Sequence, residues 1–194
     1  MNEAKANNKL AGWLTLGGIF IAAVAVTVVV GTRGSSDTET TFPDLGDIAA
    51  QDPDLPDTSA PAPTFVLPTL GGGTFDLSRH IADDGRPVIL NLWASWCGPC
   101  RSEMPAIDAS SIQHPEVAFI GVAVQDKRSD AVSFVEELGV GYTIAIDDGT
   151  VDEAYPALGL PATFFIAGDG TLVKTHFGVV TEESLAEDIA TLFG

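Results

Sequence analysis

The sequence predicts an α/β fold with a central mixed β-sheet flanked by helices, preceded by one N-terminal transmembrane helix. The transmembrane helix is predicted because residues 10–30 carry no charged side chain. The α/β fold is predicted because strand-like and helix-like segments alternate through residues 64–194, before a closing hairpin and helix. The 194 residues suffice for one domain with additional segments, and a hydrophobic content of 45% suffices for its core.

Residues 10–30 are long enough to cross a bilayer, because a helix of about 21 residues spans ~31 Å and the hydrocarbon core is ~30 Å thick. Lys5 and Lys9 precede this segment, and only Arg33 follows it closely. The positive-inside bias therefore places residues 1–9 in the cytoplasm and the folded domain on the extracytoplasmic side of the cell membrane. A cleaved signal peptide is the alternative, although its apolar region would span only about 7–15 residues.

Residues 31–63 are predicted to form a disordered linker. From residue 34 to residue 63 the chain has seven acidic residues, five prolines and no Lys or Arg, so it cannot bury enough apolar surface to order itself. The whole chain has 27 acidic and nine basic residues, for a formal net charge of −18. This charge excludes an electrostatic basis for nucleic-acid binding, which needs clustered Lys and Arg.

The first half of the domain predicts two buried strands around one helix. Residues 64–78 indicate a short hairpin or extended lead-in, because TFVLPTL and TFDLS flank three glycines. Residues 87–94, PVILNLWA, are an almost continuous apolar run, which is typical of a central strand covered on both faces. Residues 97–113 are helix-like, with Pro105 expected to bend the helix, and residues 117–124 predict the second buried strand.

The second half of the domain predicts a strand, a short helix or turn, a hairpin and two longer helices. Ser129 is expected to cap a helix that ends at Gly139. Thr181 is expected to begin the last helix with an imperfect capping box, because Ser184 stands where Glu or Gln is usual. The remaining elements are a strand at 142–147, a short helix or turn at 151–158, a hairpin at 162–178 and the last helix at 181–193.

The only two cysteines of the chain lie in the motif WCGPC, at the predicted start of a helix. Cys97 would stand where unpaired N–H groups and the helix dipole favour a thiolate, which is the attacking form of cysteine. Cys100, one turn further, would face the same side and resolve a mixed disulfide. Gly98 permits close approach of a partner backbone, and Pro99 suits the first helical turn. The motif therefore predicts thiol–disulfide exchange.

Two other interpretations of the cysteine pair are weaker. A structural disulfide would close a loop of four residues, for which the chain-entropy model gives about 2 kcal/mol, against about 4.7 kcal/mol for a 100-residue loop. A zinc site needs about four ligands, and the pair supplies half of them. The three histidines, His80, His114 and His176, are scattered and are expected at the surface or in packing. No bound metal is predicted.

The motif WCGPC after a buried strand resembles the thioredoxin superfamily over residues 64–194. Trp93 and Trp96 match the tryptophans before the motif, and Leu160-Pro161 matches the cis-proline loop. The predicted membrane anchor, the lead-in hairpin and the additional segment 125–158 narrow the resemblance to one branch of this superfamily. Together they resemble the membrane-anchored TlpA/ResA-like thiol–disulfide oxidoreductases.

This resemblance implies a redox-active Cys97–Cys100 disulfide in place of a bound cofactor, in which Cys97 attacks and Cys100 resolves. Asn91 stands where many cytoplasmic thioredoxins have a buried Asp, and its amide cannot accept the proton of the buried thiol. Glu103 matches the glutamate that follows the second cysteine by three residues in ResA-like proteins, so we expect it to tune or deprotonate the pair. The alternative for Glu103 is an ordinary exposed helix carboxylate.

The resemblance also implies a substrate-binding surface around the motif. We expect a cis peptide bond before Pro161, so that the main chain of Leu160 is held beside the cysteines to bind an extended substrate peptide. Trp96, Gly98 and Pro99 are expected to complete this surface.

As a whole, the resemblance implies an extracytoplasmic reductase of exported protein disulfides. Apocytochrome c is the leading substrate candidate, and a membrane protein of the CcdA/DsbD type is the expected electron donor. The first alternative is a disulfide-forming oxidant that uses the same residues. A peroxiredoxin-like peroxidase is the second, because APAPTFVLPTL is similar to the lead-in of that family. The third is a non-enzymatic metal-binding or peptide-binding module.

Overall fold

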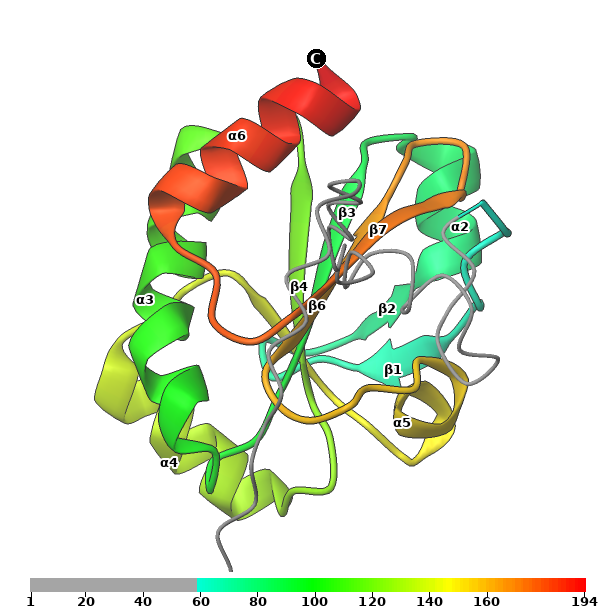
Figure 1. Cartoon of the computed structure of the whole chain (residues 1–194). Coiled ribbons are helices and arrows are strands. Elements are labelled where there is room, and N and C mark those ends of the chain that lie inside the picture. The colour runs from blue at the N-terminus through cyan, green and yellow to red at the C-terminus, as the bar shows by residue number, and fades with distance from the viewer. Residues whose placement is uncertain (1–58) are drawn as a thin grey trace, which may run out of the picture. The chain divides into compact units, whose positions relative to one another are not determined.

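The computed structural model describes residues 59–194 (Figure 1). The predicted transmembrane helix at 10–30 and most of the predicted linker at 31–63 lie outside these residues. Within residues 59–194, no helix is long and apolar enough to cross a membrane.

The centre of the domain is a mixed five-stranded sheet with the order β5-β4-β3-β6-β7. Strand β3 pairs in parallel with β4, which pairs in parallel with β5. On its other side β3 pairs antiparallel with β6, and β6 pairs antiparallel with β7. The strands are β3 (Val88–Trp93), β4 (Ala118–Ala123), β5 (Thr143–Ile146), β6 (Ala162–Ile166) and β7 (Leu172–Phe177). The predicted central mixed sheet is confirmed.

Helices cover both faces of the sheet. Figure 1 shows α3, α4 and α6 on one side, with α2, α5 and the β1–β2 hairpin on the other. The hairpin consists of β1 (Val66–Pro68) and β2 (Thr74–Asp76), which pair antiparallel as predicted. The helices are α2 (Leu77–Asp83), α3 (Gly98–Gln113), α4 (Arg128–Leu138), α5 (Thr150–Ala154) and α6 (Glu182–Phe193).

Two helix starts differ from the sequence-based expectation, whereas α6 starts after Thr181 as predicted but with a complete capping box. Helix α2 was not expected, and it begins where the carboxylate of Asp76 accepts the N–H of Arg79 at 3.0 Å. The prediction that Ser129 caps α4 is wrong, because the helix begins at Arg128 and its N-cap makes no side-chain hydrogen bond. The capping box of α6 is complete, because the hydroxyl of Ser184 accepts the N–H of Thr181 at 2.9 Å in place of a carboxylate.

The two central strands are buried along their whole length, which explains their apolar sequences. Every residue of β3 and β4 is buried. Asn91 is the polar exception in β3, and the register places it opposite Thr163 of β6. A buried amide needs partners, so this position marks polar chemistry inside the core.

Residues just before 64 also bond to the domain. The N–H of Ala62 donates to the carbonyl of Gly170 at 2.8 Å, and the N–H of Leu172 donates to the carbonyl of Ala60 at 3.0 Å. Residues 60–62, near the end of the predicted linker, therefore pair with the turn of the β6–β7 hairpin and with the first residue of β7.

Candidate active site

The two cysteines form a disulfide at the N-terminus of α3. Their Cα atoms are 5.3 Å apart, and Cys97 is the N-cap of the helix. The N–H of Cys100 donates to Sγ of Cys97 at 3.2 Å, so a helical N–H points at the sulfur that the sequence identifies as the nucleophile. Cys97 retains 5% exposure and Cys100 has none, so Cys97 is the more accessible of the two cysteines.

The predicted substrate-binding residues differ in their exposure. Gly98 and Pro99 are exposed, and Trp96 is 62% exposed. The Leu160–Pro161 peptide bond is cis, as expected from the resemblance. Pro161 is buried, and half-buried Leu160 packs against the core cluster that contains both cysteines.

Glu103 lies on α3 three residues after Cys100, and the two side chains are both fully buried. This burial excludes the alternative of an exposed helix carboxylate. The side-chain amide of Asn91 donates to Oε1 of Glu103 at 2.7 Å, and the backbone N–H of Val180 donates to Oε2 at 2.9 Å. Burial outweighs these two donors and raises the pKa of Glu103 from 4.5 to about 7. Glu103 therefore exchanges its proton near neutral pH.

The sequence analysis missed two members of this buried polar group. Thr163 accepts a second hydrogen bond from the amide of Asn91, at 3.2 Å. Val180, in the loop before α6, contributes its backbone N–H. Thr163 carries a detectable signal, because it is the polar residue in the buried strand ATFFI, as Asn91 is in VILNLW. A backbone donor such as that of Val180 leaves no signal in the sequence.

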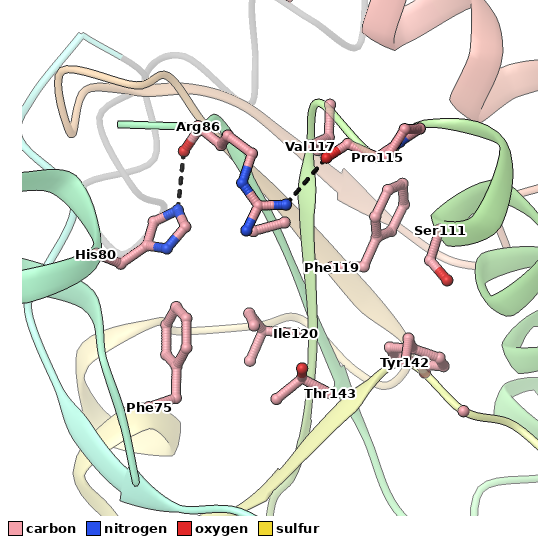
Figure 2. Close-up of a pocket in the computed structure, with 12 residues that line it drawn as sticks. Phe75, His80, Arg86, Ser111, Pro115, Val117, Phe119, Ile120, Tyr142 and Thr143 are labelled. Carbon is pink, nitrogen blue, oxygen red and sulfur yellow. Dashed lines mark hydrogen bonds between the residues drawn. The ribbon is translucent and has the colours of Figure 1, made fainter. Parts of the chain in front are cut away.

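A pocket at the start of β4 is separate from the cysteine pair. Figure 2 shows it lined by His80, Arg86, Phe119 and Tyr142, among other residues. His80 bonds the carbonyl of Arg86 at 3.0 Å, and the guanidinium of Arg86 donates to the carbonyl of Pro115 at 2.9 Å. None of the residues that line this pocket is Cys97, Cys100 or Glu103. The redox pair therefore lies outside this pocket.

Comparison with known proteins gives matches over this same domain. The model of the AhpC/TSA family matches residues 58–175. The thiol:disulfide interchange protein DsbE of Yersinia pestis is 32% identical over 137 residues, which are 69% of this chain and 71% of DsbE. The thiol-disulfide oxidoreductase ResA of Bacillus subtilis is 34% identical over 128 residues, which are 64% of this chain and 69% of ResA.

A solved structure supports the same relationship. A secreted disulfide oxidoreductase of Mycobacterium tuberculosis, described as homologous to E. coli DsbE, superposes with a TM-score of 0.58 at 28% identity. The match covers 66% of this chain and 96% of that one.

Proposed function

Because the chain belongs to the AhpC/TSA family, has a thioredoxin-like fold and is a thiol–disulfide oxidoreductase, we propose that it reduces disulfides of exported proteins. The observation that carries this proposal is the Cys97–Cys100 disulfide at a helix N-terminus, backed by the buried carboxyl group of Glu103. A pair of this kind can accept or donate two electrons, and a buried group with a pKa of about 7 can handle the accompanying proton.

The proposed reaction starts from the dithiol form. The thiolate of Cys97 attacks one sulfur of the substrate disulfide, so a mixed disulfide forms and the other substrate sulfur leaves as a thiolate. Glu103 then takes the proton of the Cys100 thiol. The Cys100 thiolate attacks Sγ of Cys97, which restores the enzyme disulfide and releases the second substrate sulfur. The substrate gains two electrons, and the enzyme pair loses them.

We place this reaction on the extracytoplasmic side of the cell membrane, with residues 10–30 as a single-pass anchor and residues 31–63 as a linker. The extracytoplasmic side is supported by the similar oxidoreductase of Mycobacterium tuberculosis, which is a secreted protein. An enzyme that loses two electrons in an oxidising compartment must regain them. We therefore propose a membrane electron donor of the CcdA/DsbD type, and apocytochrome c as a substrate.

The surface around the disulfide is proposed to bind an extended segment of the substrate. Leu160 lies beside the cysteine cluster and would offer main-chain hydrogen bonds, whereas exposed Trp96 would contact apolar side chains. Gly98 and Pro99 leave space for the partner backbone, and Pro161 holds the Leu160 segment in place.

The direction of electron transfer is tested by the reduction potential of the cysteine pair. The full-length chain would be equilibrated in glutathione or dithiothreitol buffers, and the dithiol fraction would be read by thiol alkylation. A potential near the roughly −270 mV of thioredoxins supports a reductase, whereas a value near about −120 mV, that of strong oxidants, would make the chain a disulfide donor. If the reduced chain consumed hydrogen peroxide as fast as it reduces a protein disulfide, a peroxidase would be favoured instead.

Glu103→Gln tests the proton transfer. Glutamine occupies the same volume but cannot accept the Cys100 proton, so the rate of insulin disulfide reduction should fall by roughly 10²-fold near pH 7, at the lower end of the range for general acid–base catalysis. The pH dependence centred near pH 7 should also disappear. Stopped-flow reduction of insulin over pH 5–9 measures both. An unchanged pH profile would remove Glu103 from the mechanism.

A further inference from the structure

Trp96 is the most exposed aromatic feature beside the reactive sulfur, yet its indole is held in place. The side chain is 62% exposed and directly precedes Cys97. Its indole N–H donates to the backbone carbonyl of Gln125 at 3.3 Å. At this exposure, water could accept the hydrogen bond of the indole N–H. The bond to Gln125 therefore matters because it fixes the orientation of the indole ring.

Gln125 adopts an unusual backbone conformation to make this contact. Its φ is 50°, and no other non-glycine residue in the described part of the chain has a positive φ. The left-handed region is disfavoured for a side chain of this kind, so the surrounding contacts must hold it there. The side-chain amide of Gln125 donates to both carboxylate oxygens of Asp152, at 2.9 and 3.1 Å. Asp152 belongs to α5, so this helix anchors the loop after β4.

Asp126, the residue after Gln125, holds Ser95, the residue before Trp96. Asp126 accepts the N–H of Ser95 at 2.6 Å and the hydroxyl of Ser95 at 2.9 Å. The loop after β4 therefore bonds to both residues that precede Cys97. Asp126 holds the main chain, whereas Gln125 holds only the indole.

We propose that Gln125 and Asp152 are positioning residues that orient Trp96 for recognition of protein substrates. This inference rests on the proposed function and adds the residues that set its selectivity. A fixed aromatic side chain loses little conformational entropy when a partner binds. The bond that Trp96 donates to Gln125, and the bonds that Gln125 donates to Asp152, therefore favour large apolar partners. Small disulfides, which do not reach Trp96, gain nothing from this arrangement.

The test is Asp152→Ala in the full-length chain, with Glu153→Ala as the matched control. Glu153 is the exposed neighbour in α5, carries the same charge and makes no hydrogen bond to Gln125. Asp152→Ala should raise KM for insulin by about three- to tenfold, the range that corresponds to one lost hydrogen bond, and should leave kcat unchanged. Glu153→Ala should leave both constants unchanged. An unchanged KM in Asp152→Ala would overturn the proposal.

A double-mutant comparison shows whether Asp152 acts through Trp96. Trp96→Phe removes the indole N–H, so adding Asp152→Ala to it should raise KM no further. Equal effects of Asp152→Ala in the two backgrounds would also overturn the proposal.

The position of the indole gives a readout that does not depend on activity. In ¹⁵N NMR spectra, Asp152→Ala should move the indole N–H signal of Trp96 but not that of buried Trp93, and Glu153→Ala should move neither. An unmoved Trp96 signal would exclude the arrangement itself. If the wild-type chain failed to reduce insulin, the proposed function and the recognition role would fall together, while the indole signal would still report whether Trp96 is held.

Discussion

At the scale of single residues, the main electrostatic feature is a carboxyl group that has no contact with solvent. Glu103 keeps two hydrogen-bond donors, from Asn91 and Val180, but these do not replace full hydration. The pKa of Glu103 therefore rises to about 7. Such a group costs stability when it ionises, and the protein keeps it next to its redox pair.

This cost predicts a pH-dependent stability. The folded-state pKa is raised, so between pH 4.5 and about 7 the folded chain binds more protons than the unfolded chain, and stability falls as the pH rises through this window. Glu103→Gln removes the effect. The stability of Glu103→Gln relative to wild type should grow by about 3 kcal/mol from pH 4.5 to pH 8, measured by urea unfolding.

Glu187→Gln is the control, because Glu187 is exposed on α6. It should keep the wild-type pH dependence. A constant difference between Glu103→Gln and wild type across this range would mean that Glu103 ionises without cost in the folded state.

Asn91 is expected to set how far the pKa of Glu103 rises. Its amide stabilises the carboxylate, so Asn91→Ala should raise the pKa of Glu103 above its wild-type value. Thr163→Val is the control, because it removes an acceptor of the Asn91 amide and leaves the bond to Glu103. Titration of the Glu103 carboxyl carbon by ¹³C NMR measures both. Equal pKa values in Asn91→Ala and wild type would show that the amide has no electrostatic role.

At the scale of elements, close contact between β3, β4 and β5 depends on one glycine. Gly121 of β4 lies close to the side chains of Ile144, Tyr142 and Trp93. A Cβ there would stand 2.8 Å from Cδ1 of Ile144 in β5, 2.9 Å from Cε2 of Tyr142 and 3.0 Å from Nε1 of Trp93. Trp93 also stacks on Phe134 of α4, with ring centroids 5.5 Å apart, so it cannot move away freely. Trp93 is the last residue of β3, so these contacts hold the end of the strand that leads to the cysteines.

Gly121→Ala should therefore destabilise the domain by about 1–3 kcal/mol, the cost of overpacking a filled core. Gly159→Ala is the matched control, because a Cβ at Gly159 would meet no atom within 4 Å. Urea unfolding, followed by tryptophan fluorescence, compares the two. If both variants unfold at the same urea concentration, the side chains next to Gly121 can shift without a cost in stability.

At the scale of the whole molecule, charge is the dominant property. Residues 59–194 have 19 acidic and six basic side chains, and this net charge of −13 gives strong self-repulsion in the folded domain. Ion pairs such as Arg101–Glu137, at 2.6 Å, and Lys174–Asp188 offset little of this repulsion, because they are few and partly exposed.

Added salt should therefore stabilise the protein, because screening weakens the repulsion more than it weakens the few ion pairs. The melting temperature is expected to rise from about 10 mM to about 1 M NaCl, where the Debye length falls from ~30 to ~3 Å. Glu136 is exposed on α4, and Glu136→Lys lowers the net negative charge by two. This variant should weaken the dependence of the melting temperature on salt. A melting temperature that falls with salt would mean that the ion pairs dominate.

The local pattern of the sequence determined the order of strands and helices and the position of the redox pair. Short, nearly continuous apolar runs are typical of strands covered on both faces, so β3 and β4 were predictable from VILNLW and AFIGVA. Short α2 and the start of α4 were not predicted correctly, because one hydrogen bond decides where a short helix begins. The chemistry of Cys97 and Cys100 was predictable from the motif WCGPC and its place between a buried strand and a helix.

The tertiary structure decided what surrounds that pair. Glu103 could have been an exposed helix carboxylate, and only the packing of α3 on the sheet and on the loop before α6 buries it beside Asn91. Gln125 and Asp152 lie 27 residues apart and acquire a common role only when α5 meets the loop after β4. Periodicity reports which face of an element is buried, whereas a pKa or an oriented side chain depends on the groups that distant segments bring into contact.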